Sequence, residues 1–289
     1  MDRRSFSRSL GLGLAAGLVA APGVSRGAQA TAGATPATPG SANAPVTAPG
    51  AAAAGATSAA AAPAPFRFGM IIFDGMTNLD FAAPQDAFTK LRGGQVHVLA
   101  KTRDAVKTDT GGRVLPDLAL SEAPELDLLF IGGGPGVNAL MEDAEMLGFL
   151  AARAPRAQWI TSVCTGALVL GAAGLLRGYR AATHWTAMEV LPLLGAEPVH
   201  ERVVIDRNRI TGGGVTAGLD FGLAVLAKLG GDDLARLVQL GQEYDPAPPF
   251  DSGSPRKAPA AIVERFRNAT ARTTAERMAA ARRAAAKFG

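Results

Sequence analysis

The chain has 289 residues, of which 48% are hydrophobic and 19% are charged, enough for one large α/β domain or two small ones. Its single cysteine excludes an internal disulfide and a cysteine-rich zinc site. The formal net charge is +4, but the basic residues gather at the two ends and leave residues 66–253 net acidic, which argues against a nucleic-acid-binding face there.

The first 30 residues have the features of an export signal. Arg3 and Arg4 are followed by a moderately apolar stretch that ends at about Val24, and Ala-Gln-Ala stands at 28–30. A charged head, a short apolar segment and a small-residue cleavage site are typical of a targeting segment, and the paired arginines are typical of the twin-arginine kind. We therefore expect export to the periplasm. The alternative is an N-terminus without such a role.

Residues 31–65 are almost entirely Ala, Pro, Gly, Ser and Thr, a composition that cannot bury a core, and we expect a disordered linker. After it, no apolar run reaches the roughly 18 uninterrupted residues typical of a membrane span, so the sequence predicts no transmembrane helix in the mature part.

From Phe66 onward, short apolar runs alternate with helical segments. The apolar runs predict strands at 66–73, 95–100, 126–131 and 158–163, with shorter strands at 180–183, 203–206 and 210–211. Helices are predicted at 79–90 (with Pro84 near its first turn), 143–154, 165–176, 217–229 and 232–242, and a minor hairpin ends at 113–116. This alternation predicts one α/β domain over 66–253, with a mostly parallel sheet covered on both faces.

The tail, residues 254–289, differs in composition because it is rich in Ala and Arg. Ile262, Val263, Phe266 and Met278 follow a loose helical spacing, which predicts one or two helices with a basic face. Two interpretations remain open: a solvated helix that lies on the domain, or a surface that contacts anionic lipid or a protein partner.

Cys164 stands between a predicted strand and a predicted helix, which is the arrangement of a nucleophile elbow. Gly166 and Ala167 would let that helix start close to the sheet. Unpaired N–H groups and the positive dipole end at a helix N-terminus favour a thiolate, so we expect a low pKa for the Cys164 thiol. A thiolate is a strong nucleophile. The alternative is a buried, inert cysteine.

Three further features fall at the carboxyl ends of predicted strands, where open α/β sheets bind ligands. The run from Gly132 to Gly134 forms either an anion pocket of N–H groups or a plain tight turn. Asp80 is either an acid near the thiol or a helix N-cap. His184 is either part of the site or structural.

Four segments resemble, in order, the ThiJ/PfpI superfamily, which has the class I glutamine amidotransferase-like fold: FDGMTNLDFAAPQDAF, IGGGPG, SVCTGALVLGAAGLLRGYRAATHW and TGGGVTAGLDFGLAVL. The segment QEYDPAPPFDSGSP further resembles the isonitrile hydratase subgroup. The resemblance covers about residues 66–253. It implies an α/β flavodoxin-like three-layer sandwich with a mostly parallel sheet, usually a homodimer.

The resemblance also implies roles for single residues. The nucleophile corresponds to Cys164, the acid that contacts the thiol to Asp80, and the residue after the nucleophile to Thr165. The amide-lined pocket, and a histidine near the thiol in some members, correspond to Gly133, Gly134 and His184. Members that act as peptidases usually carry His directly after the Cys, so Thr165 argues against peptidase activity.

The activity implied is hydration of a small-molecule isonitrile to an N-substituted formamide, without a metal or cofactor. Cys164 would attack the terminal carbon, Asp80 would carry the proton, and Thr165 would orient water or substrate. Trp185 and Phe250 would line the mouth of the pocket. Two alternatives remain: a redox-sensing protein whose thiol is oxidised, and a glyoxalase-like enzyme that acts on reactive carbonyls.

Overall fold

The computed structural model describes residues 65–288. The predicted export signal, 1–30, and the predicted linker up to residue 64 lie outside the described residues. The described residues belong to one compact unit that includes the C-terminal tail.

A seven-stranded sheet forms the centre of this unit, in the order β10-β11-β7-β6-β1-β2-β5. Its strands are β1 (Phe66–Ile71), β2 (Gly94–Ala100), β5 (Leu118–Ala119), β6 (Leu128–Ile131), β7 (Trp159–Val163), β10 (Val203–Asp206) and β11 (Arg209–Gly212). The pair β10–β11 is antiparallel, and the other neighbours are parallel. The predicted mostly parallel sheet is confirmed.

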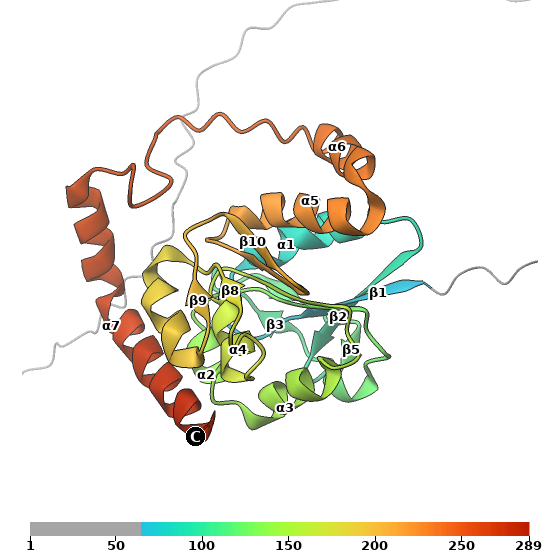
Figure 1. The fold of residues 1–289 in the computed structure, drawn as a ribbon, viewed down its shortest axis with the longest axis horizontal. Helices are drawn as coiled ribbons and strands as arrows, with labels where there is room; N and C mark the ends of the chain where they lie inside the picture. The colour runs from blue at the N-terminus through green and yellow to red at the C-terminus, as the bar shows by residue number, and fades with distance from the viewer. Residues whose placement is uncertain (1–64, 289) are drawn as a thin grey trace, which may run out of the picture. The chain divides into compact units, whose positions relative to one another are not determined.

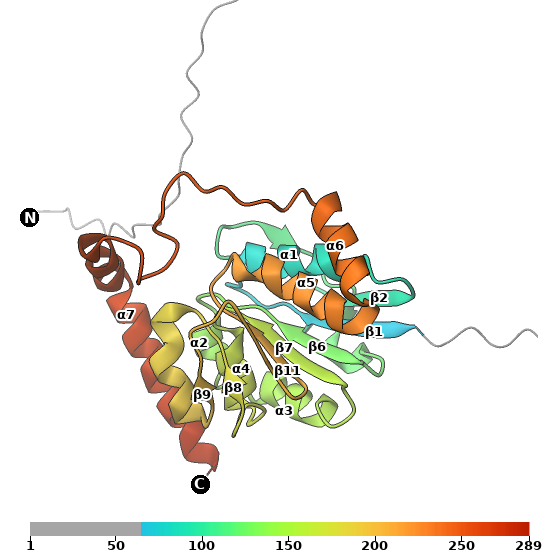
Figure 2. The same cartoon turned by 45° about the horizontal axis from the view of Figure 1, so that its top comes forward.

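Helices cover both faces of the sheet (Figures 1 and 2). On one face lie α1 (Asn78–Phe88) and α5 (Ala217–Gly230), with α6 (Asp232–Gly241) packed on α5. On the other lie α2 (Val137–Leu140), α3 (Ala144–Arg153) and α4 (Gly166–Ala172). Because β6 is covered from both sides, all four of its residues are buried and apolar. The predicted three-layer sandwich is confirmed.

Four phenylalanines join the sheet to α1 and α5. Phe68 and Phe88 stack with ring centroids 4.6 Å apart, and Phe130 lies 5.6 Å from Phe221. Phe88 also meets Phe130 edge-on at 5.9 Å. All four side chains are fully buried. Such aromatic pairs add packing energy beyond the area they bury, so this cluster fixes α1, the helix that carries Asp80, against the sheet.

Two small sheets and three 3₁₀ helices complete the domain. Strands β3 (Val106–Lys107) and β4 (Arg113–Val114) form the predicted minor hairpin. The strand predicted at 180–183 is β8 (Arg180–Ala181), which pairs with β9 (Glu197–Pro198) outside the main sheet. The 3₁₀ helices are η1 (Leu120–Glu122), η2 (Trp185–Leu194) and η3 (Ala286–Phe288). The sequence did not predict η2, because its ten residues are mostly apolar and are interrupted by Pro192, so they show no clear helical periodicity.

Pro84 lies in the interior of α1, so its prediction near the first turn is wrong. Helix α1 begins at Asn78, after the N-cap Thr77. Because proline has no N–H, the carbonyl of Asp80 four residues earlier lacks its usual helical donor. The helix predicted at 165–176 also ends early, at Ala172.

The tail forms one long helix, α7 (Ala260–Ala285), which packs against η2, α2 and α4 (Figure 1). Ala280, Ala281 and Ala284 are buried, and Arg283 forms an ion pair with Glu142 at 2.7 Å. The interpretation of the tail as a helix that lies on the domain is therefore confirmed. A contact of its exposed face with lipid or a partner remains a prediction.

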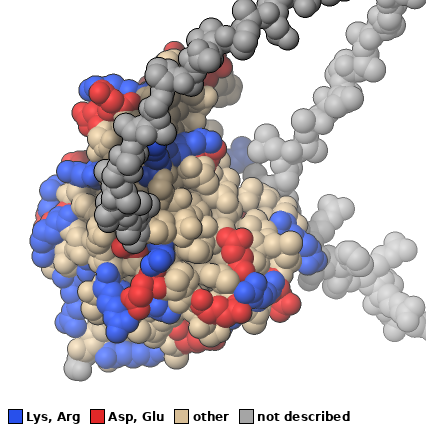
Figure 3. Space-filling model, turned by 90° about the vertical axis from the view of Figure 1, so that its right-hand side faces the viewer, with Lys and Arg blue, Asp and Glu red and all other residues tan. Residues whose placement is uncertain are grey.

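On the face shown in Figure 3, acidic and basic side chains lie close together around an area of uncharged residues. Several surface charges are paired, as Arg103 is with Glu122 and Lys101 with Asp143, both at 2.8 Å. Exposed pairs of this kind contribute little stability.

Within residues 65–288, no helix is long and apolar enough to cross a membrane.

The turn from β7 into α4 requires a glycine at position 166. A Cβ there would meet the backbone oxygens of Ile131 and Gly132, the latter at 2.7 Å. Backbone cannot move aside as a side chain can, so we expect Gly166→Ala to lower the free energy of unfolding by about 1–3 kcal/mol.

Gly148 in α3 supplies the matched control, because a Cβ there meets nothing within 4 Å. Gly148→Ala should raise the free energy of unfolding by up to about 1 kcal/mol, since alanine is the better helix former. Urea unfolding of both variants measures the difference, and changes of the same sign would contradict the tight packing at the elbow.

Candidate active site

Cys164 forms a strained turn between β7 and α4. Its φ angle is 56°, in the left-handed region that non-glycine residues avoid. The Cys164 N–H donates to the carbonyls of Gly212 at 3.1 Å and Gly213 at 2.7 Å, and the Thr183 hydroxyl donates to the Cys164 carbonyl at 2.8 Å. Strain of this kind persists only where the surroundings hold it. The structure thus has the elbow that the sequence predicted, with the side chain 5% exposed.

Asp80 is fully buried in the first turn of α1, close enough to the Cys164 thiol for each group to shift the pKa of the other. Its Oδ2 accepts a hydrogen bond from the Gly133 N–H at 2.7 Å, whereas Oδ1 has no N–H or O–H partner among residues 65–288. The proton of the neutral acid therefore belongs on Oδ1. The N-cap of α1 is Thr77, so the alternative interpretation of Asp80 as an N-cap is wrong.

Burial raises the pKa of the Asp80 carboxyl to about 7. The Gly133 N–H, which donates to the ionised form, and the neighbouring Cys164 thiol act in the opposite direction, while the charge of Asp109 adds to the increase. A carboxyl with a pKa near neutrality can both give and take a proton under ordinary conditions.

Burial also raises the pKa of the Cys164 thiol, and the neighbouring Asp80 carboxylate raises it further. The Thr165 N–H and the charge of Arg277 lower it. Our expectation of a low thiol pKa from the helix N-terminus is wrong, because α4 has seven residues and Cys164 precedes its N-cap, Thr165. Loss of hydration outweighs the short helix. The thiol and carboxyl are best regarded as one coupled pair.

The glycine loop after β6 holds this pair in place. The Gly133 N–H binds Asp80, and the Gly134 N–H donates to Thr165 Oγ1 at 3.0 Å. A Cβ at Gly133 would lie 2.5 Å from Thr165 Oγ1 and 3.0 Å from Asp80 Oδ2, so only glycine fits. The expectation that Gly133 and Gly134 line an anion pocket is therefore wrong, since both N–H groups are already bonded to side chains.

Thr165 lies next to Cys164 and is 3% exposed. Its hydroxyl is bonded within the glycine loop, which connects it to Gly134 and leaves its role toward water or substrate a prediction. The position of Thr165 explains how the residue after the nucleophile affects the site: it ties the elbow to the loop that holds Asp80.

His184 is the N-cap of η2, and its Nδ1 lies 2.8 Å from Thr186 Oγ1 and accepts the Thr186 N–H at 3.3 Å. Because Nδ1 accepts, the ring proton lies on Nε2. Burial lowers the pKa of His184 to about 4, and the charge of Arg277 acts in the same direction. The imidazole is therefore neutral at ordinary pH.

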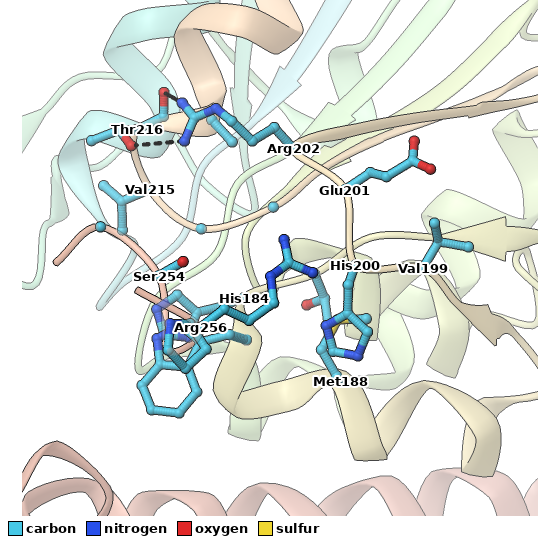
Figure 4. Close-up of a pocket in the computed structure, with 17 residues that line it drawn as sticks. His184, Met188, Val199, His200, Glu201, Arg202, Val215, Thr216, Ser254 and Arg256 are labelled. Atoms are coloured by element: carbon cyan, nitrogen blue, oxygen red, sulfur yellow. Dashed lines mark hydrogen bonds between the residues drawn. The ribbon is translucent and has the colours of Figure 1, made fainter. Parts of the chain in front are cut away.

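A cavity of about 520 Å³ lies next to residues that hydrogen-bond the elbow backbone, although Cys164 and Asp80 are not themselves among its lining residues (Figure 4). Thr183 and Gly213, which bond the Cys164 backbone, both line it, as do His184 and Trp185. Further lining comes from 199–202, 214–217 and 253–256. Its size suits a small molecule. The predicted lining by Phe250 is wrong, because that side chain is 79% exposed and lies outside the cavity wall.

Sequence reasoning missed Arg277, which α7 buries against Asn138 of α2, just after the glycine loop that binds Thr165. Arg277 is 6% exposed, and its charge acts on both Cys164 and His184. One signal was available: positions 277, 280, 281 and 284 follow the i, i+3, i+4, i+7 spacing of a buried helix face, and the last three are alanines. An arginine on that stripe is unusual, because buried charges need partners.

An elbow cysteine and a buried acid on a flavodoxin-like sandwich define the class of this protein. Residues 67–228 match the DJ-1/PfpI family, and the chain belongs to that family. The predicted ThiJ/PfpI resemblance is thereby confirmed.

Among known proteins, the isonitrile hydratase of Pseudomonas putida is 48% identical over 222 residues, which are 77% of this chain and 97% of that protein. The crystal structure of a ThiJ/PfpI family protein from Pseudomonas syringae superposes with a TM-score of 0.74 and 44% identity, over 75% of this chain and 90% of that one. The glutathione-independent glyoxalase DJR-1.2 of Caenorhabditis elegans is 30% identical over 146 residues, 50% of this chain and 78% of that protein.

The raised pKa of Asp80 has a consequence for stability. Below about 4, near the carboxyl's ordinary pKa, the group is neutral in both the folded and unfolded states, and the contribution of the neutral acid is fully present. As the pH rises through about 7, the folded state must ionise a buried group and this stability is lost. The side chain in Asp80→Asn cannot ionise. The free energy of unfolding of this variant, relative to that of the native protein, should therefore increase between about pH 4 and pH 7 by at most about 4 kcal/mol and then level off.

Thermal unfolding as a function of pH measures this effect. Asp86→Asn is the control on the same helix. Gln242 and Lys90 lower the pKa of that exposed carboxyl, so its contribution to stability should change with pH in the opposite direction. Parallel stability curves for Asp80→Asn and the native protein would contradict a raised pKa at Asp80.

Proposed function

We propose that the protein is a cysteine-dependent hydratase that converts an isonitrile, R–N≡C, to an N-substituted formamide, R–NH–CHO. The observation that carries this proposal is the pairing, in one buried site, of an elbow thiol with a carboxyl of pKa about 7. The 48% identity to an isonitrile hydratase over almost its whole length supports the same substrate class.

The first half of the reaction attaches the substrate and starts from the ionised form of Asp80, which a pKa of about 7 makes available near neutral pH. The Cys164 thiol gives its proton to the Asp80 carboxylate, and the sulfur attacks the terminal carbon of the isonitrile. Asp80 then passes the proton to that carbon, which gives the thioimidate R–N=CH–S–Cys. One S–C bond and one C–H bond form, one of the C–N π bonds is lost, and no oxidant or reductant is needed.

The second half releases the product. Asp80 takes a proton from water as the oxygen adds to the thioimidate carbon, and it returns the proton to nitrogen. The adduct R–NH–CH(OH)–S–Cys then collapses, with the C–S bond breaking as the hydroxyl loses its proton through Asp80 to the sulfur. The sum is one water added to one isonitrile, with the thiol and the carboxyl restored.

The surrounding residues orient this chemistry. The Gly133 N–H fixes Asp80 Oδ2 and leaves Oδ1 for proton transfer. The cavity beside the elbow offers the apolar side chains of Trp185, Met188 and Val199 to the R group. His184 is neutral and does not supply a cation to the reaction.

Turnover of cyclohexyl isocyanide by the full chain tests the proposal, with the formamide product followed directly. We expect Cys164→Ser to abolish turnover and Asp80→Asn to lower kcat by roughly 10²-fold or more, because a positioned acid–base contributes about that much. Asp86→Asn, exposed on the same helix, should retain native turnover. The proposal fails if the native protein releases no formamide or if Cys164→Ser retains its rate.

Glyoxalase-like activity is the second candidate, supported by the 30% identity to a glyoxalase and by the same thiol–carboxyl pair. Methylglyoxal offered to the same variants distinguishes it, because only that reaction consumes the aldehyde. The redox-sensing alternative is less favoured, since peroxide reacts with the thiolate and burial raises the pKa of Cys164.

We propose also that the protein is exported to the periplasm and forms a homodimer. Arg3 and Arg4 ahead of a moderately apolar stretch support the twin-arginine route. Arg3→Lys together with Arg4→Lys should abolish export of a reporter fused to the first 65 residues, and unchanged export would exclude this route. Family membership supports the dimer, which sedimentation should detect.

A further inference from the structure

Helix α7 packs on the three elements that border the reactive thiol. Helix α4 follows Cys164, η2 follows His184, and α2 follows the glycine loop. All three are in contact with α7, which runs beside η2 in both views (Figures 1 and 2). The tail is therefore placed to contribute side chains to the site.

Arg277 is the charged residue that α7 buries. Its Nε donates to Asn138 Oδ1 at 3.2 Å, and Asn138 Nδ2 donates to the Thr273 carbonyl one turn earlier at 3.2 Å. Asn138 belongs to α2, directly after the glycine loop. These two bonds fix the base of the guanidinium between α7 and the loop that holds Asp80.

A buried arginine normally has a carboxylate partner, because an unpaired charge in a protein interior is costly. Arg283, two turns further along α7, has one: Glu142 accepts from it at 2.7 and 2.8 Å. Arg277 has no such pair among residues 65–288, and the acidic group whose charge acts on it there is the Cys164 thiol. An ionised Cys164 would supply the opposite charge that Arg277 otherwise lacks.

We infer that Arg277 is a positioning residue of the active site, whose guanidinium is the counter-charge for the anion formed at Cys164, so that the C-terminal helix is part of the catalytic unit. The inference requires Cys164 to be the reactive group, as in the proposed function, but it does not require an isonitrile as the substrate.

The charges around the thiol explain why such a residue is needed. Asp80 and Asp109 contribute negative charge near the site, and His184 is neutral. When the thiol proton passes to Asp80, the negative charge moves to sulfur and stays buried. An opposite charge nearby favours the ionised form, and Arg277 supplies it from α7.

Alkylation of Cys164 in the full chain tests this inference without reference to any enzyme substrate. The probe is iodoacetamide, a neutral reagent that reacts with the thiolate, and the readout is the pH at which the alkylation rate is half-maximal. Arg277→Met keeps the bulk and removes the charge. It should raise that midpoint by about one pH unit and slow alkylation roughly tenfold near neutral pH.

Two variants separate charge from packing. Arg277→Lys keeps the charge and should alkylate within roughly threefold of the native protein, since a one-unit pKa change corresponds to tenfold. Arg283→Gln removes a charge and a domain contact from the same helix, and its midpoint should be unchanged. A native midpoint in Arg277→Met, or an equal loss in the Met and Lys variants, would overturn the inference.

A second reagent strengthens the test. Iodoacetate carries a negative charge, so the ratio of its rate to that of iodoacetamide should fall in Arg277→Met and be maintained in Arg277→Lys.

If Arg277→Met does not fold, Asn138→Ala decides the question, because this variant removes the hydrogen bond that holds the guanidinium but keeps the charge. A smaller midpoint shift in the same direction supports the inference, and an unshifted midpoint overturns it. If the alkylation midpoints shift as expected but the native protein releases no formamide from cyclohexyl isocyanide, the inference stands and the proposed function fails.

Discussion

The burial of the Asp80 carboxyl and the Cys164 thiol close to one another is the constraint on which the site depends. Both groups lie in the apolar interior, where neither is readily ionised. Burial raises the pKa of both groups. Near neutral pH the pair therefore retains the carboxyl proton in part, whereas an exposed aspartate would have released it. A proton retained between a nucleophile and an acid is what an addition of H and OH to one carbon requires.

Strand order brings these groups together. In the sheet, β6 lies between β1 and β7, and all three strands run parallel. The carboxyl end of β1 leads to Asp80, that of β6 to the glycine loop and that of β7 to Cys164. The loop therefore lies between acid and nucleophile, and bonds to Asp80 through Gly133 and to Thr165 through Gly134. Its glycines are required by close approach and not by a need to bind an anion.

The fold does not determine which substrate the site accepts. The thiol–carboxyl pair suits several additions to electrophilic carbon, and a fold shared by isonitrile hydratases and glyoxalases does not choose among them. In the proposed function, the substrate is selected by the cavity wall, which is built from η2, from the turn before β10, from the start of α5 and from 253–256. These segments follow the elbow in the chain.

The C-terminal helix changes the boundary of the functional unit. By composition, residues 254–289 differ from the domain, yet Ala280, Ala281 and Ala284 are buried against it. Small side chains let α7 approach closely, and the same face delivers Arg277 to the site. A division of the chain after Gly253 would separate the thiol from the cation that acts on it.

The sequence by itself determined the succession of the main strands and helices along the chain and the elbow at Cys164, whereas the proximity of Asp80 came from the family resemblance. These features are encoded locally, in apolar periodicity and in short motifs, and the main-sheet strands predicted from 66 to 163 are each found within a few residues.

Tertiary structure alone decided the direction of the thiol pKa, the bonded state of the glycine-loop N–H groups and the place of Arg277. Each depends on residues far apart in the chain: Gly133 and Asp80 are separated by 53 positions, and Arg277 and Asn138 by 139. The free energy of a charge depends on how much water and which partners surround it. Those surroundings exist only once the sheet, the elbow and the last helix have packed together.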